Sequence, residues 1–394
     1  HLPLPEEALY LQSARCMACG IPFCNGIGCP LGNRIPEFND LVYNHRWREA
    51  CEILHANNNF PEITGRICPA PCEAACTLSL HQEPVLIREI ELQIVEKGWQ
   101  EGWIAPRPPK EMSGKRVAVI GSGPAGLAAA QQLARAGHEV VLFEKNEQAG
   151  GLLRYGIPDF KLDKRVLDRR LDQLRAEGVD FQTGVQVGED LSLRYLQRRF
   201  DAILLALGAG RPRDLVVAGR GFENIVFAMD YLTQQNRVNA GEDIGDEPRI
   251  LATGKTVVVI GGGDTGSDCV GTARRQGAKE IHQFEILPKP PEGTDPDAPW
   301  PMWPRILRTS SSHEEGCRRR WSVLTKSFSG SGVNASEVHG IGVRWKKENG
   351  RWRMKEVAGS EFEQPAELVI LAMGFEHVEH SGLVEKFGLK LDEK

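Results

Sequence analysis

The sequence predicts an α/β protein: a helical N-terminal domain followed by two parallel-sheet domains, the second inserted into the first. Three observations support this prediction. Eight of the ten cysteines lie at or before Cys76, within a stretch of helical periodicity. A strand–turn–helix–strand unit with a glycine-rich turn occurs twice, starting near 117 and near 257. Two similar apolar stretches, 200–210 and 366–375, bracket the second unit.

The helical domain is predicted over 1–110. Residues 35–59 and 85–99 carry apolar side chains at helical spacing. Cys51 lies in the first of these segments, and we expect it to be a buried thiol on an amphipathic helix. The stretch GWIAPRPPKEMSGK then breaks the periodicity, and its prolines and glycines are typical of a linker.

Seven of the N-terminal cysteines form two closely spaced groups, C-x2-C-x4-C-x4-C-P and C-x3-C-x3-C. Their members are Cys16, Cys19, Cys24 and Cys29, then Cys68, Cys72 and Cys76. Structural zinc prefers two separated pairs of ligands, and a disulfide scaffold suits a short secreted chain. Dense cysteines with a proline directly after two of them are more typical of iron–sulfur clusters. The spacing therefore favours iron–sulfur over zinc, and either over disulfides.

The composition argues against several classes of protein. A chain of 394 residues, 41% of them apolar, is long enough for two or three domains with cores. Its net charge of −5 argues against a nucleic-acid or anionic-membrane partner. No apolar run approaches the roughly 20 residues of a membrane helix. We expect no nucleic-acid partner, no membrane partner and a cytoplasmic location.

The first glycine-rich unit, KRVAVIGSGPAGLAAAQQLARAGHEVVLFEK, is predicted to bind a dinucleotide. Its pattern predicts a strand over 117–120, a helix over 124–136 and a strand over 139–143. The glycines let the backbone approach a pyrophosphate, the helix N-terminus faces its charge, and the acid after the second strand can bind ribose hydroxyls. A lone glycine motif is weak evidence, whereas the complete unit is strong. The candidate residues are Gly121, Gly123, Pro124, Ala125, Gly126, Glu144 and Lys145.

The second unit, KTVVVIGGGDTGSDCVGTARRQGAKEIHQFEI, repeats this pattern. Its first strand covers 257–260, and Glu285 ends its second strand as Glu144 ends the other. Two dinucleotide folds imply two dinucleotides, and a nicotinamide with a flavin is the usual pairing for electron transfer. The candidate residues are Gly261, Gly263, Asp264, Thr265, Gly266 and Glu285. The alternative for Glu285 is a strand end that faces solvent.

The stretches FDAILLALGAG and AELVILAMGF are both apolar strands that end in small residues and a glycine, Gly208 or Gly374. They suggest crossing points between an outer and an inserted domain, and each is also consistent with a buried parallel strand. On this interpretation the flavin-binding domain covers 111–210 and resumes over 371–394. The nicotinamide-binding domain covers 211–370.

Longer motifs make a family resemblance specific. They are CMACGIPFC, CPLGNRIPEFNDLVY, NNFPEITGRICPAPCEAAC, VIGSGPAGLAAA, GGLLRYGIPDFKLDK and VIGGGDTGSDCVGTARRQGA. Through them the chain resembles, over nearly its whole length, the small (β) subunit of glutamate synthase. The same electron-input module occurs in the N-terminal half of dihydropyrimidine dehydrogenase. FEILPKPPEG and PWPMWPRILR are most similar to the NADH-type branch.

The resemblance implies an oxidoreductase with two Rossmann-like, glutathione-reductase-like domains. NADH (or NADPH) would dock on the second fold and FAD on the first. Electrons would pass through two [4Fe-4S] clusters to the large (α) subunit, which makes glutamate from glutamine and 2-oxoglutarate, in a hetero-oligomer. Two alternatives stay open: the electron-input module of another flavoprotein, of pyrimidine-reductase or bifurcating-transhydrogenase type, or a truncated, non-catalytic iron–sulfur partner subunit.

The resemblance also implies ligands. One cluster would be held by Cys16, Cys19, Cys24 and Cys76, and the other by Cys29, Cys68 and Cys72. In relatives a non-cysteine side chain completes the second set, and the matching position is Glu91; the alternative is a solvated helix face. Gly151 and Leu152 would contact the flavin. Relatives continue past the position of Lys394 with a segment that closes over the flavin, so we expect flavin retention to depend on it.

NADH rather than NADPH is expected from the end of the second strand in the second unit. In NADPH-using relatives this strand ends in a YRR-like run whose arginines pair with the 2′-phosphate. Here the stretch is QFEIL, in which Glu285 and Ile286 replace the tyrosine and the first arginine. A carboxylate at this position can accept hydrogen bonds from ribose hydroxyls, and it repels a phosphate.

Overall fold

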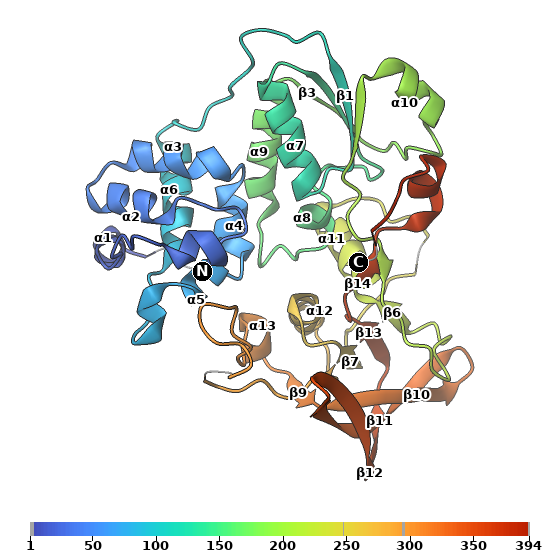
Figure 1. The fold of residues 1–394 in the computed structure, drawn as a ribbon. Coiled ribbons are helices and arrows are strands. Elements are labelled where there is room, and N and C mark those ends of the chain that lie inside the picture. The colour runs from blue at the N-terminus through green and yellow to red at the C-terminus, as the bar shows by residue number, and fades with distance from the viewer. Residues whose placement is uncertain (1–3, 247, 294–295, 393–394) are drawn as a thin grey trace. The chain divides into compact units, whose positions relative to one another are not determined.

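In a computed structural model of the chain, the structure describes residues 4–246, 248–293 and 296–392. The chain divides into two compact units (Figure 1). The first comprises His1–Gly150, Asp159–Ala206 and Pro291–Ile306, and the second comprises Gly151–Pro158, Leu207–Pro290 and Leu307–Lys394. The finer division into a flavin domain and an inserted nicotinamide domain stays a prediction.

The N-terminal part of the first unit is helical, as predicted. Its elements are α1 (Glu6–Ala14), a π-turn (Cys24–Gly28), α2 (Ile35–Tyr43), α3 (Trp47–Asn57), α4 (Pro61–Ile67), α5 (Pro71–Ala74), a 3₁₀ turn (Thr77–Leu80) and α6 (Ile87–Gln100). The stretch 35–59 forms two helices, separated where His45 adopts a left-handed φ of 60°. Within the described ranges, no helix combines the length and apolar character needed to span a bilayer.

These helices share one apolar core, and their residue spacing explains it. The core residues at helical spacing include Ile35, Phe38 and Val42 on α2 and Ile87, Ile90 and Ile94 on α6. Each of them is at most 1% exposed. Cys51 of α3 packs into the same core and is 4% exposed. The prediction of a buried thiol at this position is therefore confirmed.

A four-stranded parallel sheet follows in the first unit, with strand order β3-β2-β1-β4. Its elements are β1 (Arg116–Ile120), α7 (Pro124–Arg135), β2 (Glu139–Phe143), α9 (Lys164–Ala176), β3 (Val179–Gln182), α10 (Leu193–Arg199) and β4 (Ala202–Leu205). The predicted bounds of β1, α7 and β2 agree to within one residue. Helix α7 packs on β1 and β2, and α9 packs on β3 (Figure 1). Because β4 is an edge strand, it is partly exposed.

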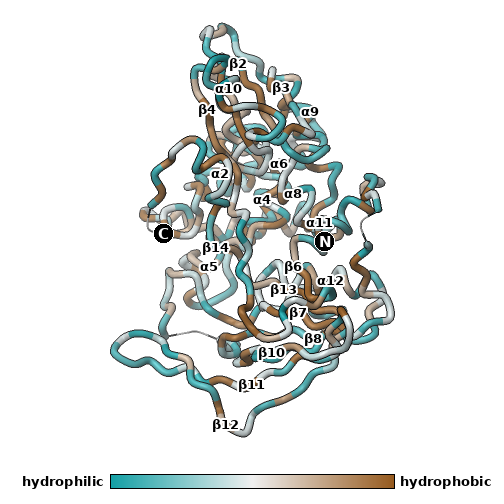
Figure 2. The backbone as a smooth tube through the Cα atoms, turned by 90° about the vertical axis from the view of Figure 1, so that its right-hand side faces the viewer, coloured by the Kyte–Doolittle hydropathy of each residue, from teal (hydrophilic) through white to brown (hydrophobic). Residues whose placement is uncertain are grey.

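The second unit contains a five-stranded parallel sheet, with strand order β6-β13-β7-β8-β9. The elements around it are α8 (Leu152–Tyr155), β5 (Arg211–Pro212), β6 (Ile225–Phe227), α11 (Ala228–Ala240), β7 (Thr256–Ile260), α12 (Asp264–Arg275), β8 (Glu280–Glu285), α13 (Ser311–Glu314), β9 (Arg318–Trp321), β13 (Leu368–Leu371) and β14 (Phe375–His377). Figure 2 shows the apolar character of β7. Strand β13 is fully buried beside β7, so the stretch 366–375 contains a buried parallel strand.

A second, antiparallel sheet in the same unit was not predicted. It consists of β10 (Val323–Ser331), β11 (Asn334–Glu348) and β12 (Arg351–Pro365), in that order. The β11–β12 turn is Asn349-Gly350, with φ of 51° and 76°. Two left-handed residues in a two-residue loop suit the twist of a hairpin. Phe328 and Val338 of this sheet pack against the parallel sheet in a shared core.

Candidate functional site

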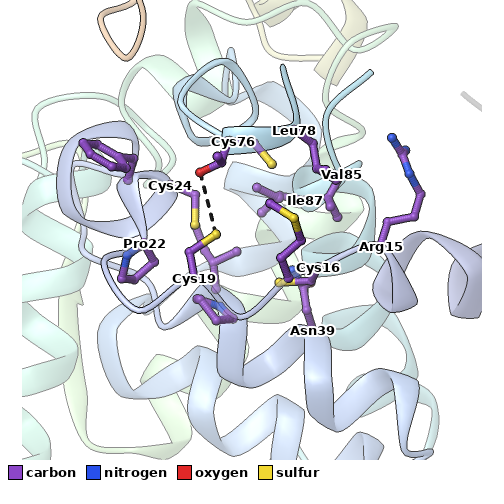
Figure 3. Close-up of a pocket in the computed structure, with 15 residues that line it drawn as sticks. Arg15, Cys16, Cys19, Pro22, Cys24, Asn39, Cys76, Leu78, Val85 and Ile87 are labelled. Atoms are coloured by element: carbon purple, nitrogen blue, oxygen red, sulfur yellow. Dashed lines mark hydrogen bonds between the residues drawn. The ribbon is translucent and has the colours of Figure 1, made fainter. Parts of the chain in front are cut away.

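Four of the predicted cluster ligands line one cavity of the first unit (Figure 3). They are Cys16, Cys19, Cys24 and Cys76. Cys16 and Cys19 follow α1, Cys24 opens the π-turn, and Cys76 precedes the 3₁₀ turn. The Cys19 thiol donates to Thr77 Oγ1 at 3.7 Å. The fold thus gathers cysteines that lie far apart in the sequence.

The surroundings of this cavity suit a metal cluster. Burial, together with the neighbouring Cys16 and Cys76 thiols, raises the pKa of Cys24 to about 12. Most of the other lining residues are apolar, such as Ile35 and Val85, and the polar ones are Arg15, Asn39 and Thr77. A free thiolate is unfavourable in such a place, whereas metal coordination stabilises the deprotonated form. The residues present therefore fit an iron–sulfur cluster.

A second group consists of Cys29, Cys68, Cys72 and Glu91. Cys29 follows the π-turn, Cys68 follows α4, Cys72 lies in α5 and Glu91 lies in α6. Burial raises the pKa of Cys72, and the charges of Glu73, Glu91, Cys29 and Cys68 act in the same direction. Two backbone N–H groups point at sulfur: Asn33 donates to Cys29 Sγ at 3.5 Å, and Ala70 donates to Cys68 Sγ at 3.4 Å. Such donors are typical of the surroundings of iron–sulfur ligands.

Glu91 is buried, with 7% of its surface exposed, so the alternative of a solvated helix face is wrong. Its Oε1 accepts from Asn58 Nδ2 at 3.0 Å and from the Thr64 hydroxyl, and its Oε2 accepts from Asn33 Nδ2 at 3.4 Å. Burial raises the pKa of Glu91 to about 7, although the Thr64 and Asn33 donors lower it. That Glu91 is an iron ligand stays a prediction, and its buried position is consistent with that role.

None of the ten cysteines, all of which are described, forms a disulfide, so that alternative is wrong. Among the described residues, no three histidine, cysteine, aspartate or glutamate side chains are arranged around one metal ion. A four-iron cluster differs from a single-ion site, because each cysteine binds an iron of its own.

The first glycine-rich turn has the geometry of a pyrophosphate site. Gly121 has a φ of 104°, which strongly favours glycine. A Cβ on Gly126 would lie 1.9 Å from the Gly121 carbonyl oxygen. A Cβ on Gly123 would meet no described heavy atom within 4 Å, and Pro124 and Ala125 are exposed at the start of α7. The helix N-terminus therefore faces open space that a phosphate can enter.

Glu144 is buried directly after β2, with 5% of its surface exposed. Its Oε1 accepts from the Asn146 N–H at 2.9 Å and from Asn146 Nδ2 at 2.7 Å. Its Oε2 accepts from the Ser122 N–H at 3.1 Å and from Ser122 Oγ at 2.5 Å. Because both oxygens already have donors, ribose hydroxyls would have to replace some of these bonds. The adjacent Lys145 is exposed.

The second glycine-rich turn repeats the geometry of the first. Gly261 has a φ of 125°, and a Cβ on it would lie 2.1 Å from the Ala372 carbonyl oxygen. A Cβ on Gly266 would lie 2.3 Å from the Gly261 carbonyl oxygen. Gly263 and Asp264 are exposed at the start of α12, and Thr265 beside them is half-buried.

Glu285 ends β8 and is half-buried. Its Oε1 accepts from the Leu287 N–H at 3.1 Å, and its Oε2 would lie 2.2 Å from a Cβ on Gly262. The carboxylate therefore lies over the glycine turn, as Glu144 lies over Ser122. Burial lowers the pKa of the nearby Arg319, while the charge of Glu285 acts to raise it.

The remaining candidate cofactor-binding residues fall in the second unit. Gly151, with a φ of 52°, precedes α8, and Leu152 is 52% exposed. Gly208 and Gly374 are exposed and have φ of 70° and 81°. The Gly374 carbonyl accepts from the Arg213 N–H at 2.9 Å, beside the β5–β14 pair. Contact of Gly151 and Leu152 with a flavin stays a prediction, as does cofactor binding by Gly208 and Gly374.

Sequence reasoning missed the three donors to Glu91 and one aromatic contact. Asparagine and threonine side chains carry no pattern that marks them as partners of a distant carboxylate. The Trp300 ring lies 4.8 Å, centroid to centroid, from Phe23, which lines the first cysteine cavity. The two tryptophans and three prolines of PWPMWP, in an otherwise polar loop, could have indicated that this segment is packed.

The two halves of the chain match two known families. Residues 1–103 match the family described as dihydropyrimidine dehydrogenase domain II, 4Fe-4S cluster. Residues 115–394 match the pyridine nucleotide-disulphide oxidoreductases. In fold, the chain is similar to FprA of Mycobacterium tuberculosis, with a TM-score of 0.54 and 20% identity over 68% of this chain and 73% of that one. The chain is thus an oxidoreductase that joins a 4Fe-4S domain to an FAD- and pyridine-nucleotide-binding domain.

Relatives over almost the whole chain define the family. The glutamate synthase [NADPH] small chain of Mycobacterium tuberculosis is 54% identical over 394 residues, which is 99% of this chain and 79% of that one. The corresponding chain of Bacillus subtilis is 46% identical over 98% of this chain and 82% of its own length. The glutamate synthase [NADH] of Schizosaccharomyces pombe is 49% identical over 94% of this chain and 18% of its own length. The chain belongs to the glutamate synthase small-chain family.

Gly126→Ala should destabilise the first dinucleotide fold, because its Cβ would overlap the Gly121 carbonyl oxygen. We expect a loss of about 1–3 kcal/mol in the free energy of unfolding, measured by thermal or denaturant unfolding. Gly123→Ala is the matched variant: its Cβ meets open space, so stability should be kept while flavin retention falls. Equal stability of the two variants would contradict this description of the turn.

Proposed function

We propose that this chain is the electron-input subunit of glutamate synthase and that it passes electrons from a nicotinamide to a large subunit. The observation that best supports the proposal is the presence, in one unit, of two cysteine groups together with a dinucleotide turn. When bound, FAD accepts a hydride and the clusters carry electrons singly. The relatives are named small chains, which supports a large-subunit partner in a hetero-oligomer. We expect this hetero-oligomer to be cytoplasmic.

We assign two [4Fe-4S] clusters to the helical domain. One would be held by Cys16, Cys19, Cys24 and Cys76, and the other by Cys29, Cys68, Cys72 and Glu91. The apolar lining of the first cavity would keep water from the first cluster. The Asn33 and Ala70 N–H groups would stabilise ligand charge at the second, because donors to a ligand sulfur favour the thiolate.

We assign FAD to the first dinucleotide fold and the nicotinamide to the second. At each turn the exposed helix N-terminus would hold the pyrophosphate, and the carboxylate after the second strand would orient a ribose. A pyrimidine-reducing module is the second candidate function, because residues 1–103 match a dihydropyrimidine dehydrogenase domain. Identity of 54% over 99% of the chain to a small chain favours glutamate synthase.

Cys19→Ser tests the proposed function. The parent protein, purified anaerobically, should carry about eight irons, and the variant about four, because one ligand set is broken. The variant should keep NADH-dependent reduction of an acceptor that takes electrons from the flavin, and should lose glutamate formation with the large subunit. Cys51→Ala, at a core thiol outside both groups, should behave as the parent. Stoichiometric zinc with little iron would refute the assignment.

Glu91→Ala tests the fourth ligand of the second cluster. Iron should fall from about eight to about four per chain, because three cysteines hold a cluster poorly. Glu89→Gln is the control: this carboxylate is also buried on α6, at 8% exposed, and accepts from Gln93 at 2.9 Å. It should leave the iron content unchanged. Full iron content in Glu91→Ala would limit Glu91 to a structural role.

We further propose that NADH is preferred over NADPH. Relatives of both names align with this chain, so the preference has to come from the site itself. The Glu285 carboxylate over the second turn can accept from ribose hydroxyls and would repel a 2′-phosphate. Arg319, whose pKa is lowered by burial and raised in part by the charge of Glu285, is a cation close enough to this carboxylate to interact with it.

Glu285→Ala should therefore shift selectivity toward NADPH by roughly tenfold, since a charge mismatch at a partly buried site is worth about 1 kcal/mol or more. The measurement is the ratio of kcat/KM for NADH and NADPH with an artificial acceptor. Glu280→Ala, at the start of the same strand, should leave the ratio unchanged. A parent that prefers NADPH, or an unaltered ratio in Glu285→Ala, would show that Glu285 does not select the coenzyme.

A further inference from the structure

A buried ion pair joins the helical domain to the first dinucleotide-binding fold within the first unit. Glu62 lies on α4 and Arg170 on α9, and their side chains are 0% and 1% exposed. Arg170 Nε donates to Glu62 Oε1 and Arg170 Nη2 donates to Glu62 Oε2, each at 2.6 Å. This two-bond geometry fixes the relative orientation of the side chains as well as their separation.

The groups around the pair leave it little freedom. Arg170 Nη1 donates to Gln173 Oε1 at 2.6 Å. The guanidinium lies over the rings of Trp99 and Phe60, 5.0 and 5.7 Å from their centroids. A buried ion pair is often no more stabilising than apolar residues of similar volume. Stability alone therefore does not explain a charged pair at this position.

A second buried carboxylate extends the same contact. Glu177, which caps the C-terminus of α9, accepts from Arg135 of α7 at 2.8 and 3.0 Å and from Gln173 at 2.9 Å. It also accepts from the Arg107 N–H at 3.1 Å, in the linker that follows the helical domain. Gln173 thus connects the two carboxylate sites, and the two domains meet through a continuous hydrogen-bonded network.

The position of Glu62 relates this contact to the proposed second cluster. Helix α4 is short, and Cys68 follows it directly. The Cys68 N–H donates to the Thr64 carbonyl at 2.9 Å, and the Thr64 side chain donates to Glu91. A displacement of α4 would therefore move one proposed cluster ligand and a donor to another.

We propose that Arg170 is a positioning residue: by binding Glu62 it sets where α4 and Cys68 lie relative to the first dinucleotide-binding fold, and so the path for electrons between flavin and cluster. The inference rests on the proposed function, because it requires a flavin on that fold and a cluster at Cys68. The rate of electron transfer between two centres falls as the distance between them grows. A defined separation is thus a reason to retain a rigid, two-bond contact.

The test uses the full chain with the double substitution Glu62→Gln/Arg170→Met. Neutral side chains of similar volume leave no unpaired buried charge, so the fold should be kept. After rapid anaerobic mixing with NADH, the flavin absorbance should fall at the parent rate. The later reduction of the clusters should be slower than in the parent. The EPR spectrum of chemically reduced clusters should match the parent spectrum, because every ligand is intact.

Arg175→Gln is the matched control, because Arg175 lies on the same helix and pairs with the exposed Asp172. It should match the parent in both phases. Arg170→Lys keeps the charge but loses the two-bond geometry, so its cluster reduction should fall between those of the parent and the double variant. If the double variant does not fold, Arg170→Lys is the test: slower cluster reduction than in the parent supports the positioning role, and the parent rate overturns it.

Cluster reduction at the parent rate in the folded double variant would overturn the positioning role, whatever its stability. A parent chain without iron, or without flavin reduction by NADH, would overturn the proposed function and this inference with it. The two failures are therefore distinguished by the parent protein alone.

Discussion

A carboxylate removed from water must be matched by donors, and the first unit depends on how this constraint is met. Glu62 is matched by one guanidinium, Glu177 by a guanidinium and amide groups, and Glu144 by a hydroxyl, an amide and two backbone N–H groups. In each case at least one donor comes from another segment of the chain. Satisfying the buried charges therefore also fixes how the helices and turns of this unit pack.

The two dinucleotide turns share their backbone geometry, and one of their sequence differences bears on the carboxylates. Ser122 Oγ donates to Glu144 and accepts from the Gly150 N–H at 2.9 Å, so the first turn is fastened to its carboxylate. Gly262 occupies the corresponding place in the second turn, and Glu285 lies where a side chain on that residue would be. A turn that is hydrogen-bonded to its carboxylate suits a cofactor that stays bound, whereas a turn without such a bond suits a ligand that exchanges. This difference agrees with the proposed assignment of FAD and nicotinamide.

Local patterns predicted β1, β2 and β4 of the first parallel sheet and β7, β8 and β13 of the second, because strand, turn and helix in units such as β1, α7 and β2 each leave a signal within a few residues. The strands β3, β6 and β9 were not predicted. The contact between Glu62 and Arg170 left none, since the two residues lie 108 positions apart. The β11–β12 hairpin had a usable signal that was overlooked: Asn-Gly between alternating strands is a strong hairpin motif. The cysteine grouping needed the family resemblance, because spacing alone does not say which cysteines share a cavity.

The helical spacing of α6 alone predicts that Glu91 is buried. It lies four positions after Ile87 and one after Ile90, on the buried face of α6, so periodicity already argued against a solvated position. A carboxylate on an apolar face is unfavourable, and three neutral donors still leave its pKa raised to about 7. Direct coordination to iron would use the negative charge that burial penalises. The same burial that makes Glu91 costly in a plain helical core therefore makes it suitable as a ligand.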